Sequence, residues 1–400
     1  MTKRPWNCFL AIAVAGVLSF ASGEKSGTSK KPVIIPAQSA LSDAWTEGLG
    51  YFKHGDYEKS IECFNRVIAA NPRDSQAYFN LGQAYYELND DKAALKSFSA
   101  EIEVNPKDEA PYFSRGILYM RMGRNDSAVA DFSAATRLKP NDTHAFFNRG
   151  LSCYALGLFQ NAINDFTFCI ANDPRDTKAF YNRGRAYERL DMNDKALEDY
   201  NAALTNGFTD FDVHMALGLL YTKMDKDSNA AREYAKAAHL VRDNASAHAN
   251  LGNAYAFLGQ NDKALAEYNY AVFYDSADAD AYYDRGLLYD KQGKADLALA
   301  DLTKAIALDS HSAKAYFHRG IVYAKRHQQE QAITDFNRAI ELSPTDAECY
   351  LDRGLAYVDV RENRKAADDL NMFLKYYGKN DRKAENFREV IKKIGYKPEY

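Results

Sequence analysis

Ten glycines recur at a fixed spacing of 34 residues, from Gly48 to Gly354, and no insertion interrupts the series. A fixed period of this length marks one supersecondary unit that is copied along the chain, with each copy packed on its neighbours. A period of 34 residues is typical of a helix–turn–helix unit. The spacing therefore predicts one elongated all-α body, in place of the separate globular domains that a length of 400 residues would suggest.

Other places of the unit are equally regular. With the glycine numbered as place 8, place 20 is alanine in every unit except the first, which has Ser60. Place 24 is aromatic in all units except the eighth and the tenth, which have Leu302 and Leu370. Small residues at places 8 and 20 allow two antiparallel helices to come close, and the large residue at place 24 fills the space around that contact. On this numbering the units begin at Leu41, Ser75, Glu109, Thr143, Thr177, Phe211, Ala245, Ala279, Ala313 and Ala347.

This pattern resembles the tetratricopeptide repeat, whose signature is Trp-x2-Leu-Gly-x2-Tyr, followed by Ala-x3-Phe, a further alanine and a closing proline. Residues 75–108 match it at Tyr78, Leu81, Gly82, Tyr85, Ala94, Phe98 and Pro106. The resemblance covers residues 41–380. It implies a right-handed α-solenoid, or superhelix, of ten helix–turn–helix units, whose first helices line a concave face that binds other proteins.

The flanking segments have other properties. Residues 1–23 begin with Lys3 and Arg4, continue with an apolar run and end in small residues, which predicts a secretory signal peptide cleaved after Gly23. An uncleaved membrane anchor is the alternative, although the run is shorter than the roughly 20 residues that a membrane span needs. Residues 24–40 are predicted to form a flexible linker. Residues 381–400 are predicted to form a capping helix and tail, with Phe387, Val390, Ile391 and Ile394 facing inward.

Charged residues vary between units in a correlated way. Place 7 is arginine in six units, and place 23 is aspartate in those same six. We expect each couple, such as Arg149 with Asp165, to form an ion pair between the two helices of one unit. Place 27 is usually small because it meets the next unit, but the second unit has Glu101 there. A buried carboxylate needs a partner, so either Arg115 pairs with Glu101 or the Glu101 side chain turns to solvent.

The first helices of units three and four carry apolar residues at places 5, 9 and 12, and unit five adds Tyr181 together with Lys178, Arg185 and Arg189. Such a strip beside a basic group suits an extended or helical segment of a partner, although packing against adjacent helices explains single residues equally well. The carboxylate clamp of some co-chaperones in the family is not matched by any three consecutive units. The expected partner groove consists of Phe113, Ile117, Met120, Phe147, Leu151, Tyr154, Tyr181 and Arg185.

Composition disfavours several other functions. The 51 basic and 55 acidic residues are spread evenly, so no nucleic-acid-binding surface is indicated. No cofactor or metal is expected, because the chain has no Gly-rich phosphate loop, no zinc motif and no paired-cysteine spacing. Cys63, Cys153, Cys169 and Cys349 are expected to be free core residues.

We therefore expect a non-catalytic scaffold that is secreted or periplasmic, with a protein or peptide partner and no membrane span after signal cleavage. A permanent structural subunit of an envelope assembly or secretion complex is the alternative. An enzyme is disfavoured, and the oligomeric state is left open.

Overall fold

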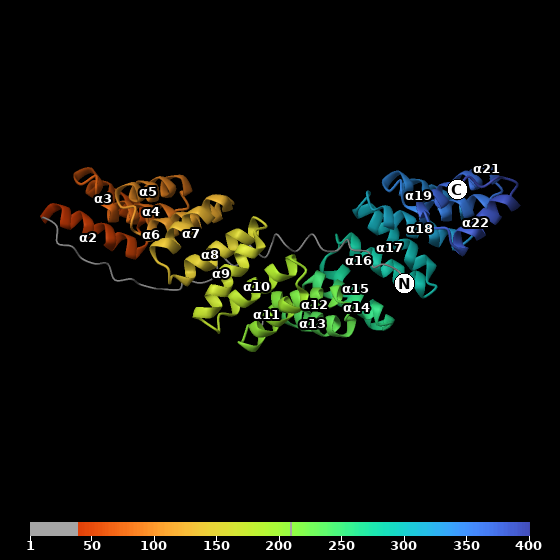
Figure 1. The fold of residues 1–400 in the computed structure, drawn as a ribbon, viewed down its shortest axis with the longest axis horizontal. Helices are drawn as coiled ribbons and strands as arrows, with labels where there is room; N and C mark the ends of the chain where they lie inside the picture. The colour runs from red at the N-terminus through yellow and green to blue at the C-terminus, as the bar shows by residue number, and fades with distance from the viewer. Residues whose placement is uncertain (1–38, 209) are drawn as a thin grey trace. The chain divides into compact units, whose positions relative to one another are not determined.

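The computed structural model describes residues 39–208 and 210–400 (Figure 1). These residues form twenty-one helices and no strand. The predicted signal peptide, residues 1–23, lies outside the described residues, as does most of the predicted linker, residues 24–40. The first described helix begins at Ser39.

The helices form ten antiparallel pairs with one helix after them. The first helices of the pairs are α2 (Ser39–His54), α4 (Ser75–Glu87), α6 (Ala110–Arg121), α8 (Thr143–Ala155), α10 (Thr177–Arg189), α12 (Phe211–Lys223), α14 (Ala245–Phe257), α16 (Ala279–Lys291), α18 (Ala313–Lys325) and α20 (Ala347–Asp359). The second helices are α3 (Tyr57–Ala70), α5 (Asp91–Val104), α7 (Asn125–Leu138), α9 (Phe159–Asn172), α11 (Asn193–Thr205), α13 (Asp227–Leu240), α15 (Asn261–Tyr274), α17 (Ala295–Leu308), α19 (Gln329–Leu342) and α21 (Asn363–Tyr377). The last helix is α22 (Arg382–Lys393).

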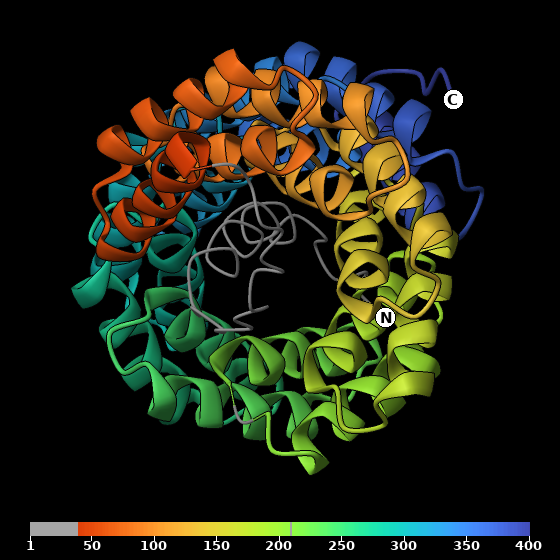
Figure 2. The same cartoon turned by 90° about the vertical axis from the view of Figure 1, so that its left-hand side faces the viewer.

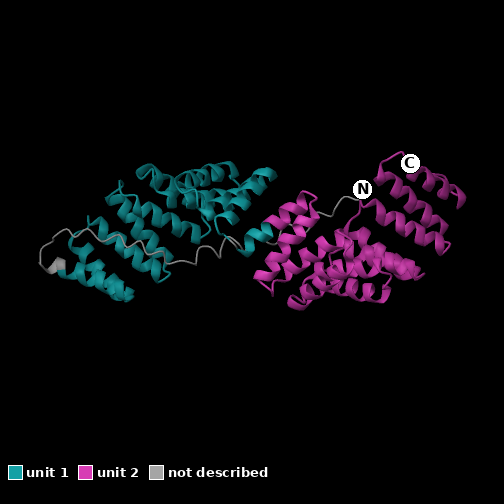
Figure 3. Cartoon of the chain, turned by 90° about the horizontal axis from the view of Figure 1, so that it is seen from below, with its two compact units in different colours: residues 1–216 teal, residues 217–400 magenta. Residues whose placement is uncertain are grey.

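The chain divides into two compact units, one ending at Ala216 and the other running from Leu217 to Tyr400 (Figure 3). Within each unit, consecutive helices pack side by side: α4 contacts both its partner α5 and α3 of the pair before it, and α16 likewise contacts both α17 and α15. Figure 2 shows the resulting two layers of helices. Each unit is therefore an all-α solenoid of tandem helix pairs, as the 34-residue period predicts.

Polar residues and left-handed turns define the ends of the helices. The side chain of Asp74 accepts a hydrogen bond from the backbone N–H of Ala77 at 3.0 Å, which caps the start of α4. Asp278 does the same for α16. Between the two helices of every pair, the residue at place 15 has a positive φ. Glycine occupies this place in half of the units, while His327 and Arg361 adopt the same conformation at a steric cost.

The core of each pair is the contact between place 8 and place 24. A side-chain carbon on Gly82 would lie 2.6 Å from the ring of Phe98, and one on Gly150 would lie 2.8 Å from Phe166. The rings of Phe98 and Phe166 are completely buried. At these two glycines a side chain has no room unless the ring moves, which confirms the predicted close approach of the two helices.

Helix α22 covers the end of the last pair. Ile391 is completely buried, and Phe387, Val390 and Ile394 pack against the same cluster. The ring of Phe387 meets that of Phe373 edge-on, with the centroids 5.2 Å apart. The four residues predicted to face inward therefore do so, and they cover an apolar face of α21.

Candidate functional site

The six arginine–aspartate couples form within their own pairs, as predicted. Arg149 donates from Nε to Oδ2 of Asp165 at 2.9 Å and from Nη2 to Oδ1 at 2.6 Å. The same two-point geometry joins Arg115 to Asp131, Arg183 to Asp199, Arg285 to Asp301, Arg319 to Asp335 and Arg353 to Asp369. Both oxygens of each carboxylate are occupied, so these groups serve the fold.

Each of these arginines also reaches the preceding pair, a contact that our sequence analysis missed. Nη1 of Arg353 donates to Asn337 at 2.7 Å, and Nη1 of Arg149 donates to Thr136 at 3.0 Å and to Ser133 at 3.4 Å. The signal was present in the sequence, because a hydroxyl or amide residue occupies place 25 of the unit before each of the six. One guanidinium therefore joins three helices and fixes the register of neighbouring pairs.

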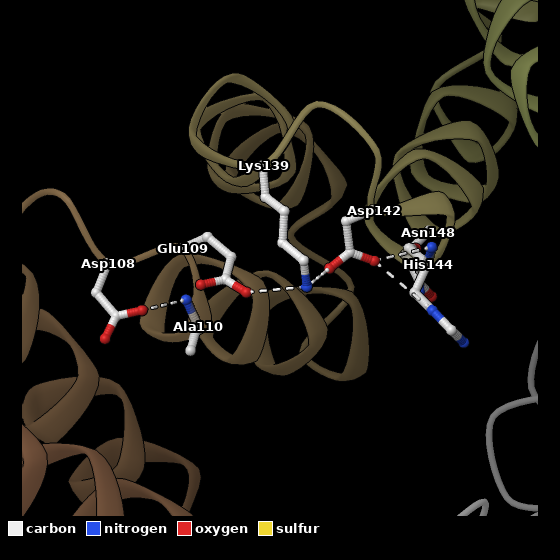
Figure 4. A network of polar contacts seen from close by, with 7 residues as sticks. All are labelled: Asp108, Glu109, Ala110, Lys139, Asp142, His144 and Asn148. Carbon is white, nitrogen blue, oxygen red and sulfur yellow. Dashed lines mark hydrogen bonds and ion pairs between the residues drawn. The ribbon is translucent and has the colours of Figure 1, made fainter. Parts of the chain in front are cut away.

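A second contact between pairs centres on Lys139, which follows α7 (Figure 4). Its Nζ lies 3.1 Å from Glu109 and 2.8 Å from Asp142, the residue that caps α8. Burial alone would raise the pKa of Asp142, but Lys139 and two backbone N–H groups hold it below its usual value. The groups are satisfied by one another, which identifies a structural link between consecutive pairs.

The sequence left two alternatives for Glu101, an ion pair with Arg115 or a side chain turned to solvent, and the structure shows neither. The Glu101 side chain is buried and does not turn to solvent, and Oε2 has no hydrogen-bond partner. Arg115 is engaged with Asp131 and with Ser99, so it does not pair with Glu101. Burial, with a smaller contribution from Asp108, raises the pKa of Glu101 to about 8.

We expect the stability around Glu101 to depend on pH. Between its usual pKa of about 4.5 and the native value of about 8, the folded chain holds a proton that the unfolded chain releases. The free energy of unfolding therefore falls as pH rises through this window. Glu101→Ala, which copies Ala135 at the same place, should raise the free energy of unfolding by about 2 kcal/mol more at pH 9 than at pH 5. Urea titrations at the two pH values measure this.

Glu103→Ala is the matched control, because Glu103 lies on the same helix with its side chain exposed. It should leave the pH dependence unchanged. Equal effects of the two substitutions at both pH values would contradict the assignment of the titration to Glu101.

The expected groove residues lie on α6, α8 and α10. Six of them are partly buried, so they are neither sealed in the core nor fully accessible to a partner: Phe113, Ile117, Met120, Phe147, Leu151 and Tyr154. Phe147 packs edge-on against the completely buried Phe166 at 5.6 Å, so part of its surface serves the core. Tyr181 is only 8% exposed, so it supports the floor of the strip and offers little surface.

Arg185 joins the two tyrosines. Its guanidinium carbon lies 4.7 Å from the ring centroid of Tyr154, on the preceding pair, and 5.7 Å from that of Tyr181. Lys178 and Arg189, at the two ends of α10, have exposed side chains. The arrangement presents a cation beside apolar and aromatic side chains from consecutive first helices.

Three further observations concern other chemistry. Within residues 39–208 and 210–400, no group of three or more metal-ligating side chains comes together. Among the helices of that same portion, none has the length and apolar character of a membrane span. Cys63, Cys153, Cys169 and Cys349 are buried thiols, and burial raises the pKa of Cys153 to about 11 and that of Cys169 to about 12. Such thiols are poor nucleophiles at neutral pH.

Comparison with known families agrees with the geometry. Models of the tetratricopeptide repeat match residues 46–110, 113–167, 159–210 and 279–312, and a further repeat model of the same kind matches residues 252–293 and 322–360. The chain belongs to the tetratricopeptide repeat family. Proteins of this family are generally non-catalytic, and this fold is that of a protein-interaction scaffold.

Several solved structures are similar. A tetratricopeptide repeat protein from Parabacteroides merdae ATCC 43184 is 22% identical with a TM-score of 0.47, over 62% of this chain and 98% of that one. YrrB, described as having an unusual peptide-binding site, is 23% identical with a TM-score of 0.43, over 49% and 97%. MamA is 20% identical with a TM-score of 0.40, over 42% and 91%. No curated protein matches the sequence.

Proposed function

We propose that the protein is a non-catalytic scaffold that binds an extended or helical segment of a partner protein along α6, α8 and α10. One observation carries the proposal. Three partly buried apolar side chains of α8, those of Phe147, Leu151 and Tyr154, pack against one cluster, and the ring of Tyr154 lies under the guanidinium of Arg185 on α10. A partner segment would cover the apolar area that the core leaves accessible, and the polar end of the strip would fix its direction.

Phe147 is the anchor that we expect to matter most. Truncation of a central aromatic residue in a binding groove typically costs about 2 kcal/mol of binding free energy, or roughly a thirty-fold loss of affinity. Peptides selected on the full chain from a random twelve-residue display library provide the probe. Fluorescence anisotropy should show this loss for Phe147→Ala with the selected peptides.

Phe317→Ala is the matched control for lost packing. Phe317 is also partly buried at place 5, and it meets the buried Phe336 at 5.9 Å much as Phe147 meets Phe166 at 5.6 Å. Both variants should lose similar stability, but only Phe147→Ala should lose affinity. Equal effects of the two variants on affinity, or no effect of either, would refute the proposed position of the groove.

We further propose, from residues 1–23 alone, that the protein is exported and works in a secreted or periplasmic location. The support is the basic start, the short apolar run and the small residues before Glu24. N-terminal sequencing of the exported protein should begin at Glu24. Recovery of the intact N-terminus in membranes would instead favour an uncleaved anchor.

A further inference from the structure

Arg185 differs from the arginines that hold the helix pairs together. Each of those six donates two hydrogen bonds to the aspartate of its own pair, as Arg183 does to Asp199 on the same α10 and its partner α11. Within the described residues, no ion pair joins Arg185 to a carboxylate. Its Nη1 donates a long hydrogen bond of 3.4 Å to Oδ1 of Asn182, and Tyr154 adds a polar contact.

The position of the guanidinium is nevertheless well defined. It lies over the ring of Tyr154 and beside that of Tyr181, and these aromatic faces help to hold the planar cation in place. Asp212, at the start of α12, attracts Arg185 without forming an ion pair, and burial together with Asp210 raises the pKa of Asp212. The guanidinium is therefore oriented, while few of its N–H groups donate a hydrogen bond within the described residues.

Two further basic residues lie on α10. Lys178 and Arg189 lie on the same helix, and neither forms an ion pair within the described part of the chain. The guanidinium carbon of Arg189 lies 4.6 Å from the ring centroid of Phe159, so this cation also rests on an aromatic face. Glu188, by contrast, accepts a hydrogen bond from the hydroxyl of Tyr200 at 2.8 Å, so it is engaged within its own pair.

We propose that Arg185 binds the side-chain carboxylate of an aspartate or glutamate in the partner, so that the segment in the groove is acidic. A guanidinium presents its N–H groups in a fork that matches the two oxygens of a carboxylate. The six paired arginines of this chain show that geometry with their own aspartates. The apolar side chains of Phe147 and Leu151 then receive an apolar residue next to the acidic one. This inference rests on the proposed function and names the chemistry of its partner.

The display library tests the inference, because peptides fused through their carboxyl ends have no free terminal carboxylate. Peptides selected on the full chain should be enriched in an acidic residue beside an apolar one. With an amidated synthetic copy, Arg185→Gln should lower affinity about ten-fold or more. Exchanging the acidic residue of the peptide for its amide should cause the same loss, and the two losses should not add.

Two further variants complete the test. Arg185→Lys keeps the charge without the fork and should lose part of the affinity, which separates recognition from simple attraction. Lys96→Gln removes a charge from an exposed residue of α5 and should change nothing. Selected peptides without acidic enrichment, or an affinity that Arg185→Gln leaves unchanged, would overturn the inference. If Phe147→Ala still weakens binding in that case, the proposed groove is retained and only the recognition of a carboxylate is rejected. If neither substitution changes the affinity, the proposed groove is rejected as well.

Discussion

Gly218→Ala is expected to lower the free energy of unfolding by about 3 kcal/mol, because the new methyl group has no room. It would lie 2.4 Å from Cε1 and 2.5 Å from Cδ1 of Tyr234. Tyr234 is itself almost fully buried, and its hydroxyl lies 3.2 Å from that of Thr222, so its ring is held at both ends. The helices α12 and α13 must therefore move apart, and the strain spreads to the neighbouring pairs.

Two other glycines provide graded controls. At Gly286 the nearest atom is Cγ of Leu302 at 3.1 Å, and a leucine side chain adjusts more easily than a ring, so Gly286→Ala should cost less. At Gly50, inside α2, a side-chain carbon meets nothing within 4 Å, so Gly50→Ala should stabilise the helix by about 0.5–1 kcal/mol.

Urea titration followed by circular dichroism gives the order of the three variants. Native-state hydrogen exchange tells whether the loss is centred on α12 and α13, since arrays of repeats need not unfold in one step. Equal stability of the Gly218 and Gly50 variants would contradict the steric explanation.

The architecture was predictable from the sequence because ten copies repeat the same contact. A residue type that recurs at places 8, 20 and 24 must suit the same neighbours each time, so the small–small–large pattern identifies the helix contact. The correlation between places 7 and 23 identified the ion pairs for the same reason. The capping helix was predictable from its amphipathic pattern alone.

Features that occur once in the chain were harder to predict. Glu101 has no counterpart in another unit, and its burial without a partner depends on Arg115 being engaged elsewhere. The burial of Tyr181 depends on rings from neighbouring elements, such as Phe208 at 5.8 Å, that no periodic pattern specifies. The lack of an ion pair between Arg185 and a carboxylate of the described residues could not be predicted from the sequence either, because it is recognised only when the surroundings of the arginine are known. Departures from the repeat therefore contain the candidate functional information, and these departures need a structure.

Asp165→Ser is expected to lower the free energy of unfolding by about 3 kcal/mol, because it leaves the guanidinium of Arg149 without its carboxylate. The side chain of Arg149 is 22% exposed and that of Asp165 only 6%, so solvent replaces the lost partner poorly. This loss exceeds the 1 kcal/mol or less that a solvent-exposed pair would be worth. Urea titration, with hydrogen exchange in α8 and α9, provides the measurement.

The second unit of this chain supplies the matched control, since it has Leu81 and Ser97 at the same two places. The double variant Arg149→Leu with Asp165→Ser copies that pair and removes both charges together. It should cost less than about 1 kcal/mol, because replacing a buried ion pair as a whole is often nearly neutral. Recovery in the double variant would show that the couples mainly specify which helices align, at a cost that appears only when one partner is missing. A double variant as unstable as Asp165→Ser would instead show that the couple itself, with its bond to the preceding pair, stabilises the array.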